Sequence, residues 1–547
     1  MNRTVTDAFK GAPKMYRLVV IMLALAAVCC GGCKTGPDYR TPEKAVPDKW
    51  SSLSPGVEAD TPAIEAAAWW TTLNDPILTS LITRGVEANL ELKLATARIR
   101  EARAARGIAA AGLLPTVGAS ASYRRMQSVE PPTQSSGSPV SVGGTFSANG
   151  FTPNVSVRGR NFNVMQNGVG STGSTSVSYT PGSQSTPSRQ SDLFMTGLDA
   201  AWELDIFGGQ QRGLEAADAD LAATEEYRRG VLASLASEIA LSYIDLRTAQ
   251  NRLEITRRNI GAQERTTLLT SDRFQAGLSS ELDSVRAQAQ LSATKSQIPM
   301  LETQTQTSMH RLAVLLAVAP GTLKEELGTP APLPVPPAMV PVGIPSDVLR
   351  RRPDIRQAER QLAASTARVG QAMADQFPKF TLTGGIGGQS GTLGGLLDSG
   401  NLLWSVGPGI SVPIFQGGRI RANIEGQNAR QEQAALFYEQ SILIALADVE
   451  NGLVSFANEQ VRGKSLQESA ASNEKAVELA NERYQRGIEG FLSVLVAQLS
   501  MYSLQDQLVE SQSMVLTDLV SLYKALGGGW ETNAPEPSAV ATANAQP

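Results

Sequence analysis

Two long stretches of the chain contain no proline, and each is long enough to form a single helix of unusual length. They run over 208–276 and 418–486, about 69 residues each, which corresponds to roughly 100 Å of helix. Apolar residues recur in both at steps of four and three, the spacing of a coiled coil. The positions are Leu232, Ala236, Ile239, Tyr243 and Leu246, then Ile442, Leu446, Val449, Leu453 and Phe456. The sequence therefore predicts long, closely packed helices.

The two stretches belong to an internal duplication. The segment RFQAGLSSELDSVRAQ, which starts at Arg273, resembles RYQRGIEGFLSVLVAQ, which starts at Arg483, at an offset of 210 residues. Each predicted copy has a helix, two strands, a long helix, a glycine turn and a return helix. The first copy spans 69–318 with its turn near 277, and the second spans 346–530 with its turn near 487. A proline-rich linker, 319–345, separates them.

Four segments alternate between apolar and small or polar residues, which predicts strands with one apolar face. They are 116–125, 193–206, 379–388 and 403–414. A soluble sandwich with a wet outer face and a transmembrane barrel both fit this pattern. Four strands cannot close a barrel, and an open edge cannot face lipid, so a barrel must be shared between chains. Two, three and four chains, giving 8, 12 or 16 strands, remain open from the pattern alone.

Two segments lack periodicity. Residues 126–192 are rich in serine, glycine and threonine, and they predict a long polar loop inside the first copy. The tail 531–547 is predicted to be disordered.

The N-terminus has the layout of a secretory signal. Lys14 and Arg17 precede a short apolar run, and Gly32 comes directly before Cys33. This arrangement resembles a bacterial lipoprotein box, in which the cysteine after the cut receives the lipid. It predicts a signal peptide over 1–32, with translation starting at Met1 or Met15. It also predicts a lipidated, extended segment over 33–68, whose Cys33 carries diacylglycerol and a fatty acid.

Other chemistry is poorly supported by the composition. The chain has one histidine and three cysteines in 547 residues, so a zinc site and a thiol redox pair are both disfavoured. The net charge of −4 argues against a nucleic-acid-binding surface. No acid–base or phosphate-binding motif predicts an enzyme, and no other cofactor is expected. No later apolar run is long enough for a membrane-spanning helix.

Several motifs, taken in order, resemble one family. They are CKTGPDYRTP from Cys33, WELDIFG from Trp202, LRRRPDI from Leu349, FPK from Phe377, PIFQGGR from Pro413 and LYKALGGGW from Leu522. This set is similar to the TolC-like outer-membrane factors of tripartite efflux pumps, in their NodT-like lipoprotein branch. The resemblance covers roughly residues 33–530.

The resemblance implies a mainly helical fold with membrane β-structure. It implies a homotrimer whose 12-stranded barrel crosses the outer membrane and continues into a periplasmic helical tunnel. The implied function is passive export of drugs or other small molecules. The implied partners are an inner-membrane RND-type transporter and a periplasmic adaptor. The exit duct of a type I protein-secretion system is the alternative, because it uses the same channel design. The transported substrates are not encoded in this pattern.

The resemblance also implies roles for individual residues. Gly277, Leu278, Gly487 and Ile488 match the hairpin tips that contact the adaptor. The periplasmic aperture is matched by Asp283, Leu492, Arg483 and Tyr484, with Glu281 and Glu489 nearby. Val496 and Ser493 stand where relatives often have aspartate, which weakens the expectation of an acidic ring from the second copy. From the strand pattern we expect Asp199, Glu203 and Asp205 to line the barrel lumen.

Overall fold

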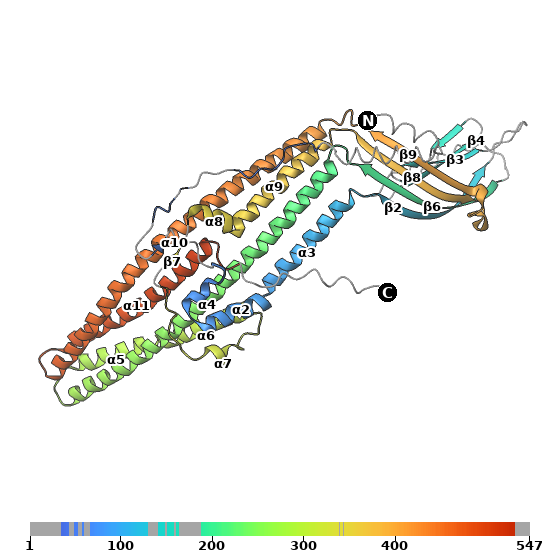
Figure 1. Cartoon of the computed structure of the whole chain (residues 1–547). Coiled ribbons are helices and arrows are strands. Elements are labelled where there is room, and N and C mark those ends of the chain that lie inside the picture. Colours follow the sequence, from blue (N-terminus) through green and yellow to red (C-terminus); the bar gives the residue numbers. More distant parts are fainter. Residues whose placement is uncertain are drawn as a thin grey trace, which may run out of the picture. The chain divides into compact units, whose positions relative to one another are not determined.

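The computed structural model describes 34–42, 47, 49–52, 57–58, 66–129, 141–147, 150–157, 160–163, 188–337, 340–342 and 344–530 (Figure 1). These residues form two compact units. One takes in Met1–Arg40, of which Lys34 is the first described residue, with Arg103–Ala219 and Ala363–Glu432. The other comprises Thr41–Ala102, Asp220–Leu362 and Gln433–Pro547, described as far as residue 530.

A four-stranded antiparallel sheet lies in the first unit. Its strands are β2 (Thr116–Val129), β6 (Ser188–Leu204), β8 (Lys379–Ser390) and β9 (Leu402–Ser411), in the spatial order β2-β6-β8-β9. Two short 3-10 turns, η2 (Leu393–Gly395) and η3 (Ser399–Asn401), lie between β8 and β9. All four predicted strands are therefore present, and they form one sheet.

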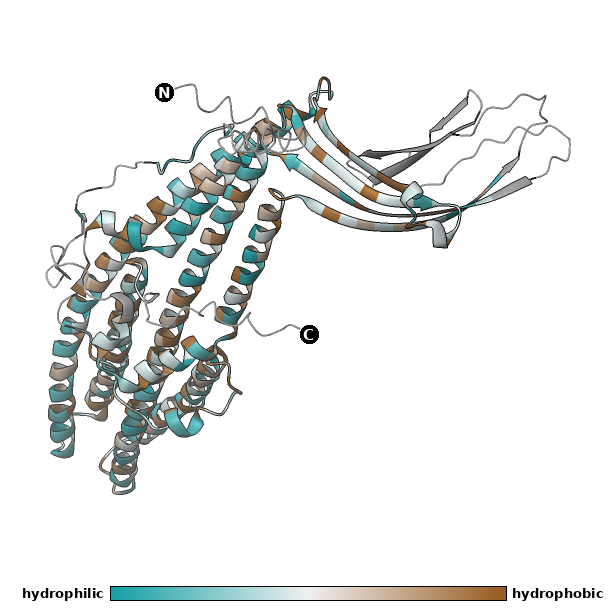
Figure 2. Ribbon diagram, turned by 45° about the vertical axis from the view of Figure 1, so that its right-hand side comes forward, coloured by the Kyte–Doolittle hydropathy of each residue, from teal (hydrophilic) through white to brown (hydrophobic). Residues whose placement is uncertain are grey.

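The pairing register puts the apolar residues of all four strands on the same face. Ala119 is opposite Leu198, Leu198 is opposite Ile386, and Ile386 is opposite Trp404. One residue along, Gly118, Asp199, Gly385 and Ser405 form the matching row of the other face. Figure 2 shows the alternating bands along the strands. We call these the apolar face and the polar face. Val406 and Ile410 on the apolar face are 62% and 66% exposed.

The expected loop at 126–192 is wrong in two respects. Strand β2 continues to Val129 and β6 already begins at Ser188, because these two segments pair with each other beyond the predicted ends. Between them lies a second, three-stranded sheet of β3 (Ser141–Ser147), β4 (Gly150–Val157) and β5 (Arg160–Asn163). The serine, glycine and threonine content of the whole stretch predicted a loop, and the short alternation of Phe151, Val155 and Val157 within β4 was overlooked.

The fourth strand also differs from its predicted span of 403–414, because it ends at Ser411. Pro408 lies within it, opposite Leu382. A proline has no backbone N–H for a ladder, and it is tolerated mainly in edge strands. Strand β9 is an edge strand of the four-stranded sheet.

The two proline-free stretches form helices of 67 residues each, α4 (Gly209–Gln275) and α10 (Arg419–Gln485). The predicted coiled-coil positions are buried in both, except that Leu446 is half-buried. The return helix of the second copy is continuous as α11 (Phe491–Ala525). That of the first copy is divided into α5 (Glu281–Lys295) and α6 (Gln297–Leu315). Pro299 accounts for this break, since its ring would clash with the carbonyl of Lys295 in a continuous helix.

Shorter elements complete the second unit. Helix α2 (Pro76–Ala88) begins after Asp75, whose carboxylate accepts the N–H groups of Ile77 and Leu78. Helices α3 (Leu90–Ala111) and α9 (Pro353–Ala374) extend into both units. The remaining elements are η1 (Ala66–Leu73), α7 (Lys324–Leu327), α8 (Pro345–Arg351) and the parallel pair β1 (Val57–Glu58) and β7 (Val340–Pro341). The linker 319–345 therefore contains helical structure, since α7 lies within it and α8 begins at its last residue.

Two sequence motifs meet at the end of α11. The Arg352 guanidinium donates to the Ala525 carbonyl at 3.2 Å and pairs with Asp354 and Asp448. The Trp530 indole donates to the Arg351 carbonyl at 3.1 Å. The motifs LRRRPDI and LYKALGGGW therefore contact each other. Each satisfies a carbonyl group left free at the end of the other's helix, Ala525 in α11 and Arg351 in α8.

Candidate functional site

The two long helices end in the same type of turn. Gly277 and Gly487 have φ of +72° and +73°, which a residue with a side chain adopts only at a cost. Their N–H groups donate to Phe274 and Tyr484, three residues back. The following residues, Leu278 and Ile488, donate five residues back, which completes a Schellman motif. The duplication is therefore preserved in hydrogen bonds as well as in sequence.

Apolar side chains are exposed at both turns. Leu278 and Ile488, predicted as adaptor contacts, are 67% and 60% exposed, and Leu492 is 54% exposed. Leu282 and Val285 on the first return helix are also exposed and were not singled out from the sequence, and Val496, noted above as a position where relatives often have aspartate, is exposed as well. Leu282 and Val285 are three residues apart and Leu492 and Val496 are four apart, and this spacing of about one helical turn was the available signal. These exposed side chains form what we call the tip surface.

The predicted aperture residues fall into different environments. Arg483 and Glu489 form an ion pair at 3.1 Å across the second turn. Asp283 is half-buried and Glu281 is exposed, and both lie in the first turn of α5, where the helix dipole favours negative charge. The structure thus keeps charge beside both glycine turns.

Tyr484 differs from these residues because it is only 3% exposed. It packs with Ala287, Ala480, Phe491 and Val494 in a small apolar cluster, and burial raises the pKa of its hydroxyl. The Arg273 guanidinium lies over its ring at 4.8 Å and donates to the Gln485 carbonyl at 3.3 Å. Tyr484 therefore holds the tips of the two hairpins together in this protomer, and its ring does not face an open space.

The three predicted lumen acids are not equivalent. Asp199 and Glu203 lie in β6 on the polar face, and Asp199 is flanked by Gly118 and Gly385. Asp205 lies beyond the strand, which ends at Leu204, and its carboxylate accepts the N–H of Gln211 at 2.7 Å. Its placement on the strand face is corrected, because it caps the first turn of α4.

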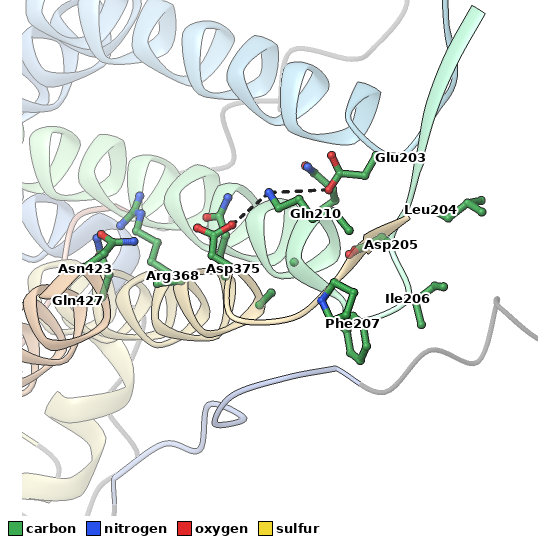
Figure 3. Close-up of a pocket in the computed structure, with 16 residues that line it drawn as sticks. Glu203, Leu204, Asp205, Ile206, Phe207, Gln210, Arg368, Asp375, Asn423 and Gln427 are labelled. Carbon is green, nitrogen blue, oxygen red and sulfur yellow. Dashed lines mark ion pairs between the residues drawn. The ribbon is translucent and has the colours of Figure 1, made fainter. Parts of the chain in front are cut away.

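Glu203 also borders a polar pocket of about 280 Å³ in the first unit (Figure 3). Lys379 links two of its three acids, at 3.1 Å from Asp375 and 4.0 Å from Glu203. Side chains of Arg368, Asn423 and Gln427 complete the visible wall. Because the acids and bases of the pocket neutralise one another in part, it provides no concentrated charge for catalysis or for a metal ion.

The first described residues of the chain are bound by a buried arginine. Arg212 of α4 is 1% exposed, and its guanidinium donates to the carbonyls of Thr35 and Gly36 at 3.0 and 3.3 Å. It also pairs with Asp38 at 2.7 Å and with Glu215 at 2.8 Å. The hydrogen bond from Arg212, followed by its charge, lowers the pKa of Asp38 below its ordinary value. The guanidinium is thus satisfied by four acceptors.

Close backbone packing reinforces this contact. Gly36 has φ of +85°, and a Cβ added to it would lie 2.4 Å from the Cα of Gly370 in α9. The Thr35 N–H and hydroxyl both donate to the carbonyl of Phe207, at 3.2 and 2.9 Å. Phe207, between β6 and α4, stacks on Phe377, between α9 and β8, with ring centroids 4.6 Å apart. We call residues 34–39 the N-terminal segment; it joins two points where the chain passes between helix and strand.

The motifs noted in the sequence contain Thr35, Gly36 and Asp38, but no role was predicted for Arg212, because the residues that it binds in the N-terminal segment are 174 to 177 positions away. Cys33, the predicted lipid site, lies outside the described residues, as do the signal residues and the tail. Within the described part of the chain, no group of three or more histidine, cysteine and acidic residues could hold a metal ion. No described helix is both long and apolar enough to span a bilayer.

Comparison with known proteins decides the family. The sequence profile of the family described as "Outer membrane efflux protein" matches residues 167–318 and 344–528. The chain belongs to this family. The protein is therefore a channel component of the outer membrane, and the family consists of efflux channels, not enzymes.

Named relatives agree along almost the whole chain. "Nodulation protein T" of Rhizobium leguminosarum bv. trifolii is 32% identical over 91% of this chain and 95% of its own length. The "Toluene efflux pump outer membrane protein TtgI" of Pseudomonas putida is 31% identical, over 93% and 98%. The "Pyoverdine export outer membrane protein OpmQ" of Pseudomonas aeruginosa is 30% identical, over 94% and 97%.

A solved structure of the outer-membrane channel OprN is similar to this chain in fold, with a TM-score of 0.77 and 33% identity. The match covers 91% of this chain and 100% of that chain. The family resemblance inferred from the motifs is confirmed, and so is the TolC-like architecture of barrel strands and tunnel helices. The roles of individual tip and lumen residues stay predictions.

The hydrogen bonds of the buried Arg212 guanidinium lead to a prediction about the N-terminal segment of this outer membrane efflux protein. Arg212→Lys removes the planar donor set, so the N-terminal segment should open more often. We expect amide exchange at Thr35 to accelerate roughly tenfold or more, since each hydrogen bond to a charged group contributes about 1.5–3 kcal/mol. Hydrogen exchange read by mass spectrometry measures this.

Arg106→Lys is the matched control, because Arg106 and its partner Asp218 are both about half-exposed. That variant should leave exchange unchanged. In the unaltered protein, exchange corrected for its intrinsic pH dependence should also accelerate as the pH falls below about 4. The pKa of Asp38 is lowered in the folded state, so its contribution is present above the unfolded pKa and is lost on protonation. Equal exchange in both variants would contradict the role of Arg212.

Proposed function

We propose that this protein is the outer-membrane exit duct of a tripartite efflux pump and that it works as a homotrimer. The observation that supports this most directly is the four-stranded sheet with one exposed apolar face. Within the described residues, β2 and β9 each pair with only one strand, so both edges of the sheet are open. Lipid offers no hydrogen bonds to such edges. Three copies give 12 strands, which close a barrel wide enough for a lumen.

In this proposal the polar face lines the lumen and the tip surface meets the periplasmic adaptor. An inner-membrane RND-type transporter supplies the energy, and the duct passes the cargo without selecting it. The cargoes for which two relatives are named support a passive role, because toluene is a small hydrocarbon and pyoverdine is a much more polar molecule. In one lumen-facing row, Gly118, Gly385 and Ser405 present little side-chain chemistry to a cargo, and Asp199 is the one charged member of that row.

Two neighbouring residues of β9 test the assignment of the faces. Val406 lies on the apolar face and Ser405 on the polar face. Val406→Lys places a charge toward lipid and should destabilise the assembled barrel by about 2–4 kcal/mol per copy near mid-membrane. Ser405→Lys places the same charge toward water and should be tolerated. The measurement is the amount of heat-resistant trimer in outer-membrane fractions; an equal loss in both variants would refute the proposed faces.

Leu492 and Asp283 are proposed to narrow the resting aperture, and Asp199 and Glu203 to favour cations in the lumen. Single-channel recording in planar bilayers separates the two effects. Leu492→Ser with Asp283→Ala should raise conductance severalfold by removing apolar bulk and charge at the tip. Asp199→Asn with Glu203→Gln should leave conductance nearly unchanged and lower the cation preference. Unchanged conductance in the first pair, or unchanged selectivity in the second, would remove the corresponding role.

Cys33 is proposed to carry diacylglycerol and a fatty acid that anchor the chain in the outer membrane. The support is the small residue before it, the apolar run before that, and the ordered N-terminal segment that begins one residue later. Cells fed labelled palmitate should label the protein, and Cys33→Ser should lose the label completely. Cys30→Ser is the control and should keep it. Label that persists in Cys33→Ser would move the site elsewhere.

A further inference from the structure

A recess of about 590 Å³ lies in the second unit and is lined on one side by the proline-rich segment 332–336, which we call the strap. Its walls are α4, α10 and α11, and its size is that of a pocket for a drug-sized ligand. We propose that this recess binds an amphipathic organic anion. The proposal concerns binding alone and does not depend on the proposed function.

Two small residues, Gly463 and Ser511, face each other in the wall of the recess. Gly463 of α10 lies far from either helix end, where glycine costs about 1 kcal/mol relative to alanine. A Cβ added there would lie 3.2 Å from the hydroxyl oxygen of Ser511 in α11. Any larger pair would fill this part of the recess. Gly463 therefore lets α10 approach α11 closely at the wall of the recess.

Ser511 supplies an unsatisfied polar group. Its side chain is 0% exposed, and its hydroxyl has no hydrogen-bond partner among the described residues. A serine within a helix usually bonds to the carbonyl four residues back, and a buried hydroxyl without a partner costs about 1–3 kcal/mol. Ser511 lines the recess, but with no exposed surface its hydroxyl is out of reach of a ligand atom in the observed structure.

The other lining residues define the ligand's chemistry. Arg258 is the only charged side chain among them, and it forms no ion pair with any described residue. Asn251 and several glutamines add neutral hydrogen-bonding groups, whereas Ile255, Val509 and the strap prolines supply apolar surface. A ligand with a flat apolar body and one carboxylate or sulfonate fits this combination, with its anion on Arg258.

The walls are held in place without a ligand. Arg252 of α4 forms two hydrogen bonds to Asp506 of α11, at 2.6 and 2.8 Å. Thr248 donates to Ser513 at 2.8 Å, and Asn259 donates to Gln505 at 3.3 Å. These contacts flank the recess along the same two helices. Binding therefore requires little reorganisation, which favours measurable affinity.

The test uses two small aromatic probes that differ in charge, the anion dansylglycine and the neutral dansylamide. The full-length protein in lipid nanodiscs is titrated calorimetrically, with empty nanodiscs as the blank. We expect dansylglycine to bind at least tenfold more tightly than dansylamide. Arg258→Gln should weaken dansylglycine about tenfold and leave dansylamide unchanged, since it removes one charge-assisted contact. Gly463→Leu, which fills the recess, should abolish binding of both.

Matched controls separate the recess from general effects. Arg257→Gln removes a neighbouring exposed guanidinium that pairs with Glu302. Gly426→Leu replaces another glycine of α10, which has open space around it. Both should bind dansylglycine as the unaltered protein does. Absence of binding to the unaltered protein, equal affinity for the two probes, or full affinity in Gly463→Leu would each overturn the proposal.

Discussion

The register of the four-stranded sheet is the constraint on which the membrane-facing part of this protein depends. Because side chains alternate along a strand, a slip of one residue between β6 and β8 would move Leu198 and Trp202 from one face to the other. The observed pairing instead adds the apolar residues of all four strands into one surface. That surface faces no core of its own chain, and both edges beside it are open among the described residues. Assembly with further copies follows from this arrangement.

The helices obey a second constraint, because a long helix must end where its backbone groups can still be satisfied. The Schellman turns at Gly277 and Gly487 satisfy the last carbonyls with local N–H groups, so no other element has to cover the ends. The ends therefore remain free to carry exposed apolar residues such as Leu278 and Ile488. A turn that needs no cover is well suited to a surface that meets a partner.

Local pattern was sufficient to predict the strands, the long helices and their turns, because alternation, heptad spacing and glycine act over a few residues. It failed where the deciding contact is distant in sequence. The burial of Tyr484 depends on Arg273 and α5, and the role of Arg212 depends on residues 34–38. Asp205 was misplaced for a different reason: strand alternation continued one residue too far, into a helix cap. Strands β3 to β5 were missed because they are short and lie in a stretch whose serine, glycine and threonine content predicts a loop.

Arg212 shows how a contact between residues distant in sequence organises a local motif. Its guanidinium binds the N-terminal segment beside Phe207, and Thr35 extends the contact to Gly370 of α9. The segment therefore touches the chain where it leaves the sheet through β6 and, by way of α9, near where it returns through β8. A lipid carried by the residue before Lys34 would be held at this point rather than on a free tether. Arg212 can be buried at 1% exposure because four acceptors satisfy its guanidinium. Three of these acceptors belong to the N-terminal segment, which must therefore be held in place.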